Sequence, residues 1–416
     1  MNSTLTDLRP IAPSQRIEAM DVLRGFALLG ILLMNMEAFV GPLLASLSGL
    51  DPQLTGADRL ADAAIYILVQ GKFYTLFSLL FGMGFAVMMQ RAIASDTPFV
   101  GLYLRRNIVL LGIGMMHALL IWSGDILVSY AIMGFLLILL FRNTPTSRLP
   151  KWGVVLVLLP GIIGLFFGSM ADLARLDPAA SVAITKSLAG QQATVEALLE
   201  GQRMAYGQGS IAEAIGQRGR DLGFMTGFLM MFGWNILGMF LIGAWFVQSG
   251  AISRPEAFES LYHKLRWLAL PSGLALVIAA FVMQPTVSFS EMSLKSGMVG
   301  LMNITGSMLM CMGYMAWIIR GLQSNAMAPR LALMAPAGRM ALTNYLTQSI
   351  VCTFIFYGYG LGFFEQLPRA WQVPFAFALW GLQLAFSRWW FTHYAIGPVE
   401  YLWRWATYGK RPKFVS

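Results

Sequence analysis

Residues 152–170 read WGVVLVLLPGIIGLFFGSM and contain no Asp, Glu, Lys or Arg. The hydrocarbon layer of a bilayer is about 30 Å thick, and a helix needs about 20 apolar residues to cross it. The run is continuous, whereas a membrane β-strand alternates apolar and polar residues. Because backbone polar groups must be satisfied internally in lipid, this stretch predicts a membrane-spanning helix.

Similar apolar runs recur along the rest of the chain. Apolar residue types make up 57% of the 416 residues and charged residues only 12%, about half of the share that a soluble domain carries. We therefore expect one all-α membrane domain over residues 1–416, a polytopic bundle of about ten transmembrane helices. The first run is long enough to span, which favours an uncleaved helix over a signal peptide. The predicted spans are 22–40, 72–90, 107–122, 126–141, 152–170, 224–248, 267–283, 297–319, 338–359 and 372–391.

Lysine and arginine differ in density between successive loops. One set of loops, which includes both terminal segments, is rich in them, whereas the short loops of the other set hold only Arg59, Lys295 and Arg369. Cytoplasmic loops carry the excess of positive charge, so we expect an even number of spans with both termini in the cytoplasm. The net charge of +9 then reflects topology, and we expect membrane lipids but no nucleic acid as partners.

Residues 171–222 form the one long segment that we place outside the membrane, between the fifth and sixth spans. Apolar residues between Ser181 and Glu200 recur at helical spacing. Two interpretations stay open: a helix that lies on the outer leaflet or caps a cavity, and a solvated linker helix between two bundles. A shorter helix is expected at 61–70, separated from the second span by Gly71.

Four ionisable side chains fall at one depth, in the outer half of the predicted bundle: Glu37, Lys72, His117 and Asp125. Such groups are costly in hydrocarbon and usually face the bundle interior or a wet cavity. They could line one pocket, or they could be structural ion pairs. His117 is either a general base or a hydrogen-bonding bridge between helices. The turn that begins at Trp122 lies five residues, or roughly 8 Å, beyond His117 at helical rise, so we expect Asp125 in that turn to make no contact with His117 unless the turn dips inward.

Other polar residues within the spans are candidates for substrate contacts. Arg24 shares a helical face with Asp21. It either contributes to a site or anchors the helix to lipid phosphates. Three polar residues share one face of the ninth span, where hydrogen bonds between helices are the alternative for at least two of them. The candidate substrate-binding set is Arg24, Asn35, Glu37, Lys72, Trp122, Asn344, Tyr345 and Gln348.

Familiar cofactor motifs are missing from the sequence. Cys311 and Cys352 have no metal-binding spacing, so we expect no metal. No P-loop, HExxH or Rossmann fingerprint occurs. Gly82 and Gly84 lie inside the second span, where they predict close packing of helices.

Three parts of the chain together resemble the YeiB-like family of bacterial membrane proteins, a family of uncharacterised function. They are DVLRGFALLGI from Asp21 with the later Asn35, MHALLIWSGDIL from Met116, and a C-terminal pair of segments, 338–349 and GPVEYLWR from Gly397. The resemblance covers nearly the whole chain. It implies a multi-pass protein of the bacterial inner membrane.

That family is in turn distantly similar to transmembrane acyltransferases of the heparan-glucosaminide acetyltransferase type. These also open with an Asp-x-x-Arg-Gly helix and an Asn near its far end, which Asp21, Arg24 and Asn35 match. They move an acyl group from cytoplasmic acyl-CoA to an acceptor on the far side of the membrane. Their catalytic His follows the first helix, but residues 38–71 contain no His. On this resemblance His117 would supply the base from another helix.

The resemblance thus implies acyl-CoA as donor and an outer-leaflet lipid or envelope glycan as acceptor. His117 would deprotonate the acceptor, Asp125 or Glu37 would orient groups, and Lys72 would bind an anionic acceptor or stabilise an oxyanion. The alternative function is a transporter or exporter of a small molecule or lipid, in which the polar cluster binds substrate or a proton. Cytoplasmic arginines would hold the CoA phosphates. The other interpretation is that these arginines only fix the topology. They are Arg91, Arg105, Arg106 and Arg142.

Overall fold

The computed structural model describes residues 17–288 and 291–415, and this part of the chain forms helices joined by turns, without a β-strand. Each predicted span corresponds to a helix. These helices are α1 (Glu18–Val40), α3 (Lys72–Ala94), α4 (Phe99–Leu120), α5 (Leu127–Phe141), α6 (Leu149–Ala174), α8 (Ile211–Gln248), α10 (Leu270–Met283), α11 (Leu294–Leu322), α14 (Ala341–Phe356) and α15 (Arg369–His393).

The helices have the length and composition of membrane spans. Among the described residues, seven helical segments are long and apolar enough to cross a bilayer, and the shorter helices α5 and α14 are apolar as well. Helix α15 is outside both groups, and it buries Arg369, Gln372 and Gln383. The expectation of an all-α polytopic membrane bundle is confirmed.

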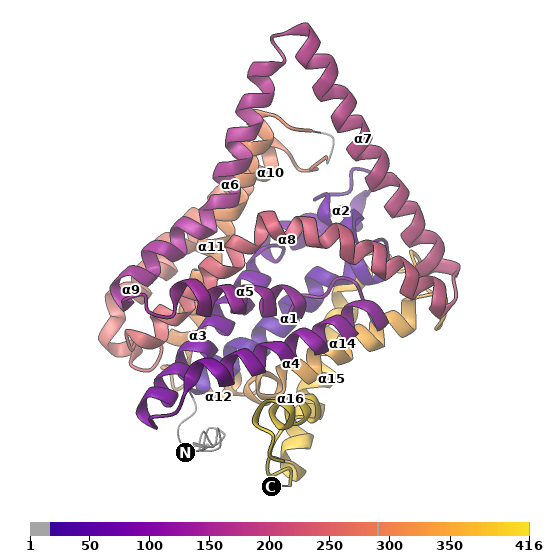
Figure 1. Cartoon of the computed structure of the whole chain (residues 1–416). Helices are drawn as coiled ribbons and strands as arrows, with labels where there is room; N and C mark the ends of the chain where they lie inside the picture. Colours follow the sequence, from indigo (N-terminus) through magenta and orange to yellow (C-terminus); the bar gives the residue numbers. More distant parts are fainter. Residues whose placement is uncertain (1–16, 289–290, 416) are drawn as a thin grey trace.

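The segment between the fifth and sixth spans is almost entirely helical. Figure 1 shows α6, α7 (Pro178–Gln202) and α8 as the sides of a triangle, with a π-helical turn, η4 (Arg203–Gln208), between α7 and α8. Helix α8 begins at Ile211, so the last residues of the predicted outer segment 171–222 belong to the same helix as the sixth span, and the location of that segment outside the membrane stays a prediction. A capping box of Ser210 and Glu213 starts this helix, and such a box satisfies the first backbone N–H groups.

Two helices extend further than predicted at the end where the chain termini lie. Helix α3 continues to Ala94 and α4 begins at Phe99, so Arg91, Arg105 and Arg106 belong to helices and not to a loop. Long basic side chains can lie along apolar surface with their charge in water. Their charge therefore ended the predicted spans too early.

Breaks between helices separate several short elements. Helix α2 (Gly56–Leu68) is separated from α3 by Gly71, whose φ of 84° suits glycine. The predicted ninth span is interrupted, since α13 (Ala335–Arg339) ends one residue before α14 begins. The other elements are η2 (Ala45–Leu47), η3 (Thr146–Arg148), η5 (Pro255–Phe258), α9 (Glu259–Lys264), η6 (Leu265–Ala269), α12 (Ala328–Ala332) and α16 (Pro398–Tyr408).

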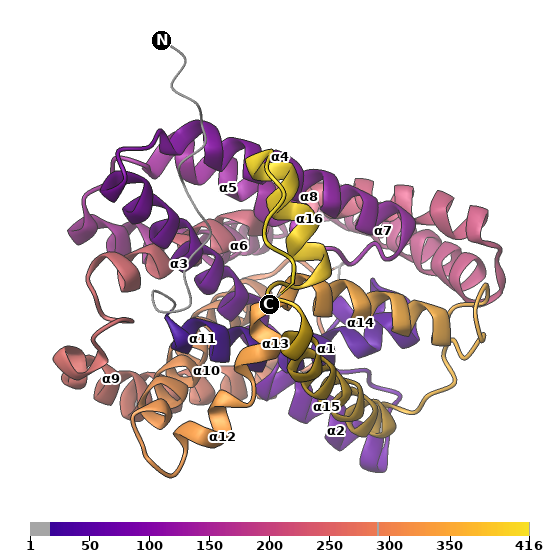
Figure 2. The same cartoon turned by 90° about the horizontal axis from the view of Figure 1, so that it is seen from below.

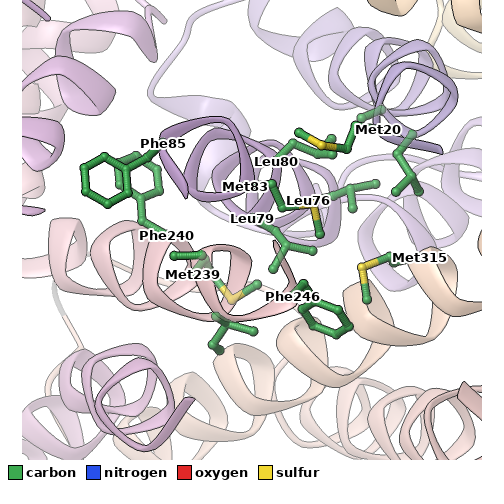
Figure 3. Close-up of a cluster of buried hydrophobic side chains, with 14 of the residues drawn as sticks. Met20, Leu76, Leu79, Leu80, Met83, Phe85, Met239, Phe240, Phe246 and Met315 are labelled. Atoms are coloured by element: carbon green, nitrogen blue, oxygen red, sulfur yellow. The ribbon is translucent and has the colours of Figure 1, made fainter. Parts of the chain in front are cut away.

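Helices α3 and α8 form the centre of the core. A Cβ on Gly82 would lie 2.0 Å from the carbonyl oxygen of Phe240, and one on Gly243 would lie 2.0 Å from that of Leu79. The two backbones therefore approach closely, as glycines in membrane helices permit. Figure 3 shows the buried side chains of this region, including Leu79, Met83 and Phe240.

The two ends of the described chain lie on the same side of the bundle. Figure 2 shows the molecule from that side, with α16 crossing it beside α4. Ile17, next to α1, and Tyr408, at the end of α16, line the same cavity. An even number of crossings gives this arrangement, whereas the cytoplasmic location of this side stays a prediction from the charge pattern.

Candidate functional site

A cavity of about 320 Å³ opens at the end of the bundle where α1 begins and α16 ends. Helices α1, α3, α4, α5, α14 and α16 contribute to its walls. At the opening it is strongly basic. Its charged lining consists of Arg24, Arg91, Arg106, Arg339 and Arg404 together with two carboxylates, Asp21 and Glu400.

The deeper part of the cavity is apolar. Its lining there comes from the middle of α1 and α3 and from the junction of α4 and α5, and includes Ile31, Phe77, Phe81, Leu110 and Leu127. Gly84 also lines the cavity, and a Cβ on it would meet only Nη2 of Arg24, at 4.0 Å. The prediction that Gly84 allows close helix packing is therefore wrong, whereas Gly82 does allow it.

Two arginines at the opening are held by neighbouring side chains. Nη1 of Arg24 donates to Oδ1 of Asp21 over 2.8 Å. The guanidinium of Arg106 lies 4.0 Å from the ring centroid of Trp403, a cation–π arrangement. These contacts keep both positive charges at the opening of the cavity.

Glu400 joins α16 to the beginning of α14. Its carboxyl accepts hydrogen bonds from the backbone N–H of Leu342 over 2.8 Å, and from the N–H and hydroxyl of Thr343 over 3.1 and 2.6 Å. Burial raises the pKa of this carboxyl, and the hydrogen bonds oppose the rise. A carboxylate suits a helix N-terminus, so Glu400 holds α14 in place at the wall of the cavity.

His117 and Asp125 form a buried pair. Nδ1 of His117 lies 2.7 Å from Oδ2 of Asp125, and each side chain is 1% exposed. The expectation that the two do not touch is wrong, because α4 ends at Leu120 and the next residues fold back. The backbone N–H groups of Ile121 and Trp122 both donate to the carbonyl of His117, and Asp125 accepts from the N–H of Val128 over 2.7 Å.

The second nitrogen of His117, Nε2, is buried and has no hydrogen-bond partner among the residues that the structure describes. When Asp125 is an ionised carboxylate it can only accept, so a neutral His117 then carries its proton on Nδ1 and Nε2 is an acceptor. That tautomer is the one that a general base needs.

Tyr345 lies between the cavity and this pair. It lines the cavity, and its ring centroid is 5.2 Å from that of His117. Ile126 and Leu127, which follow Asp125, also line the cavity. One layer of side chains therefore separates the apolar end of the cavity from the His117–Asp125 pair.

The structure does not bring the four predicted outer ionisable groups into one pocket. Glu37 pairs with Arg369, which also binds Asp62. The Nζ of Lys72 donates to the backbone carbonyl of Tyr66 over 3.0 Å. Neither Glu37 nor Lys72 lines the cavity that approaches His117. Residues at a similar depth along the membrane normal therefore point in different directions from their helices and do not meet.

The remaining predicted residues divide into cavity-lining and structural positions. Asn344 donates to Ser387 over 3.0 Å, and Gln348 donates to Gln383 over 2.8 Å, so both connect α14 to α15. Of the predicted substrate-binding residues only Arg24 and Tyr345 line the cavity, and Asn35 and Trp122 do not. Of the predicted phosphate-binding arginines Arg91 and Arg106 line it, whereas Arg105 and Arg142 do not.

Sequence reasoning missed several polar residues. Arg339, Arg404 and Glu400 line the cavity, although they lie near the C-terminus, far from α1 in sequence. Arg218 and Asp221, within the predicted outer segment, are fully buried. The capping-box pattern of Ser210 and Glu213 was the available signal for an earlier helix start.

Fold and site together define a polytopic helical membrane protein. Its cavity has a basic opening, and one layer of side chains separates the cavity from a buried His–Asp pair. Residues 246–410 match the family model described as "Protein of unknown function (DUF418)". The chain is 35% identical to the uncharacterised protein YxaH of Bacillus subtilis (strain 168), over 97% of each chain. It is 30% identical to the uncharacterised protein YeiB of Escherichia coli (strain K12), over 94% of this chain and 96% of YeiB.

The chain therefore belongs to the family of YxaH and YeiB, as its sequence segments indicated. A further relative, an uncharacterised 39.9 kDa protein of Bacillus acidopullulyticus, is 27% identical over 97% of this chain and 96% of its own length. No solved structure matches the chain.

Proposed function

We propose that the protein is an acyltransferase of the bacterial inner membrane. It moves an acyl group from cytoplasmic acyl-CoA to a hydroxyl or amine of an outer-leaflet lipid or envelope glycan. The observation that carries this proposal is the cavity, which is basic at its opening, apolar along its depth and closed by Tyr345 beside His117. Acyl-CoA has the matching order of groups, with phosphates at one end and the acyl thioester at the other.

The phosphates of CoA would bind at the opening. Guanidinium groups form strong charge-assisted hydrogen bonds with phosphate, and arginines outnumber carboxylates there. Arg24 and Arg106 are already oriented by Asp21 and Trp403. A pre-oriented side chain loses less conformational entropy when a ligand binds.

The acyl end would lie against Tyr345, and a rotation of that side chain would connect the cavity to His117. The acceptor oxygen or nitrogen then attacks the thioester carbonyl carbon, so that a C–O or C–N bond forms and the C–S bond breaks. His117 takes the acceptor's proton on Nε2 and returns a proton to the departing thiolate of CoA. Asp125 stabilises the imidazolium through Nδ1, as the carboxylate does in other His–Asp pairs.

Filling the cavity tests the proposal directly. Gly84 lines the cavity, and a Cβ built on it meets no backbone within 4 Å, so a leucine side chain in its place would occupy the cavity. Gly112 on α4 is exposed and has no other atom within 4 Å of a Cβ, so Gly112→Leu is the matched control with the same gain in helix propensity. Release of free CoA is measured in inverted membrane vesicles, which expose the cytoplasmic face and retain native acceptors.

We expect wild type and Gly112→Leu to release CoA equally, and Gly84→Leu to release none above background. The proposal is overturned if wild type releases no CoA from acyl-CoA esters of any chain length. It is also overturned if Gly84→Leu, present at the wild-type level, releases CoA as fast as wild type does.

A further inference from the structure

Arg218 is a fully buried cation in the first part of α8. Its Nη1 donates to the backbone carbonyl of Leu120 over 3.0 Å, and its Nη2 donates to the hydroxyl of Tyr359 over 2.8 Å. Its guanidinium also lies 5.5–5.9 Å from the ring centroids of Tyr206, Tyr357 and Tyr359. Neutral groups thus surround the positive charge.

No carboxylate within the described part of the chain forms an ion pair with Arg218. Asp221, one helical turn away, already accepts hydrogen bonds from four neutral side chains: Gln202, Gln217, Ser123 and Tyr206. The Nε of Arg218 is buried, and no described residue forms a hydrogen bond with it. The guanidinium therefore touches no anion directly, and a buried charge without a direct partner of opposite sign is unfavourable.

A glycine-rich loop covers Arg218. Residues 357–363, YGYGLGF, connect α14 towards α15 and supply Tyr357 and Tyr359. The N–H of Gly358 donates to the carbonyl of Tyr206 over 2.7 Å, which lies in the π-helical turn η4. π-Helical turns are rare and occur frequently at functional sites. The loop opens when this backbone hydrogen bond breaks and the ring of Tyr357, stacked 4.7 Å from that of Tyr206, moves away.

This site and the cavity meet at the same turn of chain. Leu120, whose carbonyl binds Arg218, begins the turn that leads to Asp125, and Ile126 at its end lines the cavity. Trp122 in this turn also has a buried ring N–H without a partner. Arg218 therefore lies near the His117–Asp125 pair but on the side of the turn that faces the loop 357–363.

We propose that Arg218 binds a phosphate group that enters from the end of the bundle opposite the termini, after the loop 357–363 opens. The guanidinium fork matches phosphate geometry, and phosphate would replace Tyr359 on Nη2 and supply the missing partner of Nε. The role of this phosphate as part of the acyl acceptor rests on the proposed function, whereas the anion site itself does not.

Calorimetric titration of the full-length protein in nanodiscs of neutral lipid tests the site, without acyl-CoA. The probes are inorganic phosphate and dioctanoyl phosphatidic acid, with dioctanoylglycerol as the uncharged control. We expect saturable binding of a phosphate-bearing probe and none of dioctanoylglycerol. Loss of the charge-assisted hydrogen bonds in Arg218→Gln should weaken it roughly 10- to 100-fold. The exposed Arg220 on the same helix provides the matched control, Arg220→Gln, which should bind as wild type does.

Tyr359→Phe keeps the guanidinium and removes the hydroxyl that competes with phosphate, so it should bind severalfold more tightly. This variant remains informative if Arg218→Gln does not fold. Binding of inorganic phosphate would assign a soluble phosphorylated ligand, and binding of phosphatidic acid alone would assign a lipid. The proposal is overturned if no probe binds, if Arg218→Gln and Arg220→Gln bind alike, or if Tyr359→Phe binds no tighter than wild type. Failure of acyl transfer would leave these results unchanged.

Discussion

His117 is held on one nitrogen by Asp125, and its other nitrogen is buried without a partner. Under the proposed mechanism, removing the imidazole removes the base. His117→Ala should lower the rate of CoA release about 10²- to 10⁴-fold. Its affinity for acyl-CoA should not change, because His117 does not line the cavity. Kinetics of CoA release and equilibrium binding of acyl-CoA separate the two effects, and release that survives would remove His117 from the mechanism.

Tyr345 separates the cavity from His117, so its ring should also protect the thioester from water. We expect Tyr345→Ala to release CoA together with free fatty acid, even without an acceptor, because water can then reach His117. Tyr345→Phe keeps the ring and should show no such hydrolysis. Chromatography of the acyl products measures this. Equal hydrolysis by both variants, or by neither, would contradict the assigned position of the ring.

For single residues, the sequence predicted which side chains belong to the candidate site better than it predicted their hydrogen-bond and ion-pair partners. His117, Asp125 and Tyr345 were candidates because polar residues inside apolar runs are costly. Their proximity could not be predicted, because helical rise places Asp125 beyond His117 and the backward fold of the turn is a tertiary feature. Glu37 and Lys72 were grouped with them by depth alone, whereas Arg369 and the carbonyl of Tyr66 bind them elsewhere.

At the scale of elements, Arg369 fastens three helices together. Its Nε donates to Asp62 on α2 over 2.8 Å, and its Nη2 to Glu37 on α1 over 3.1 Å. Arg369→Met would leave two carboxylates unpaired, with Asp62 almost fully buried, and should cost about 3–5 kcal/mol. Arg175→Met removes a partly exposed pair with Asp172 and should cost about 0–1 kcal/mol. Reversible unfolding in mixed micelles measures both.

Equal destabilisation by Arg369→Met and Arg175→Met would contradict this assignment. Adding Asp62→Asn and Glu37→Gln to Arg369→Met should recover part of the stability, because no buried charge then lacks a partner.

Apolar length was sufficient to find the ten predicted helices, since lipid leaves few alternatives to a helix. Apolar length did not predict where these helices begin and end. Arg105 and Arg106 lie inside α4, and Arg218 and Asp221 lie inside α8. These charged side chains lie outside the predicted spans, although snorkelling or buried hydrogen bonds accommodate them within the helices. The break between α13 and α14 was also missed, because nothing in residues 338–341 stops a helix locally.

For the whole molecule, the charge pattern predicts that the basic opening faces the cytoplasm. Cys311 and Cys352 are fully buried, so a cysteine introduced at an exposed position should be labelled without background. In intact cells, a membrane-impermeant maleimide should label Lys186→Cys on α7. It should label Lys410→Cys, beyond α16, only after permeabilisation. The opposite pattern would reverse the orientation, and labelling of both in intact cells would contradict the bundle.

The most direct measurement of the central claim uses a short-chain acyl-CoA that carries a photoreactive group next to its thioester. After illumination of the protein in membranes, mass spectrometry identifies the attached residues. We predict attachment near the apolar end of the cavity, at Phe77, Phe81, Leu127 or Tyr345, and its loss in the presence of excess unlabelled acyl-CoA. Attachment only to exposed apolar residues outside the cavity, such as Phe166 and Met230, unaffected by the competitor, would contradict the claim that this cavity binds the acyl donor.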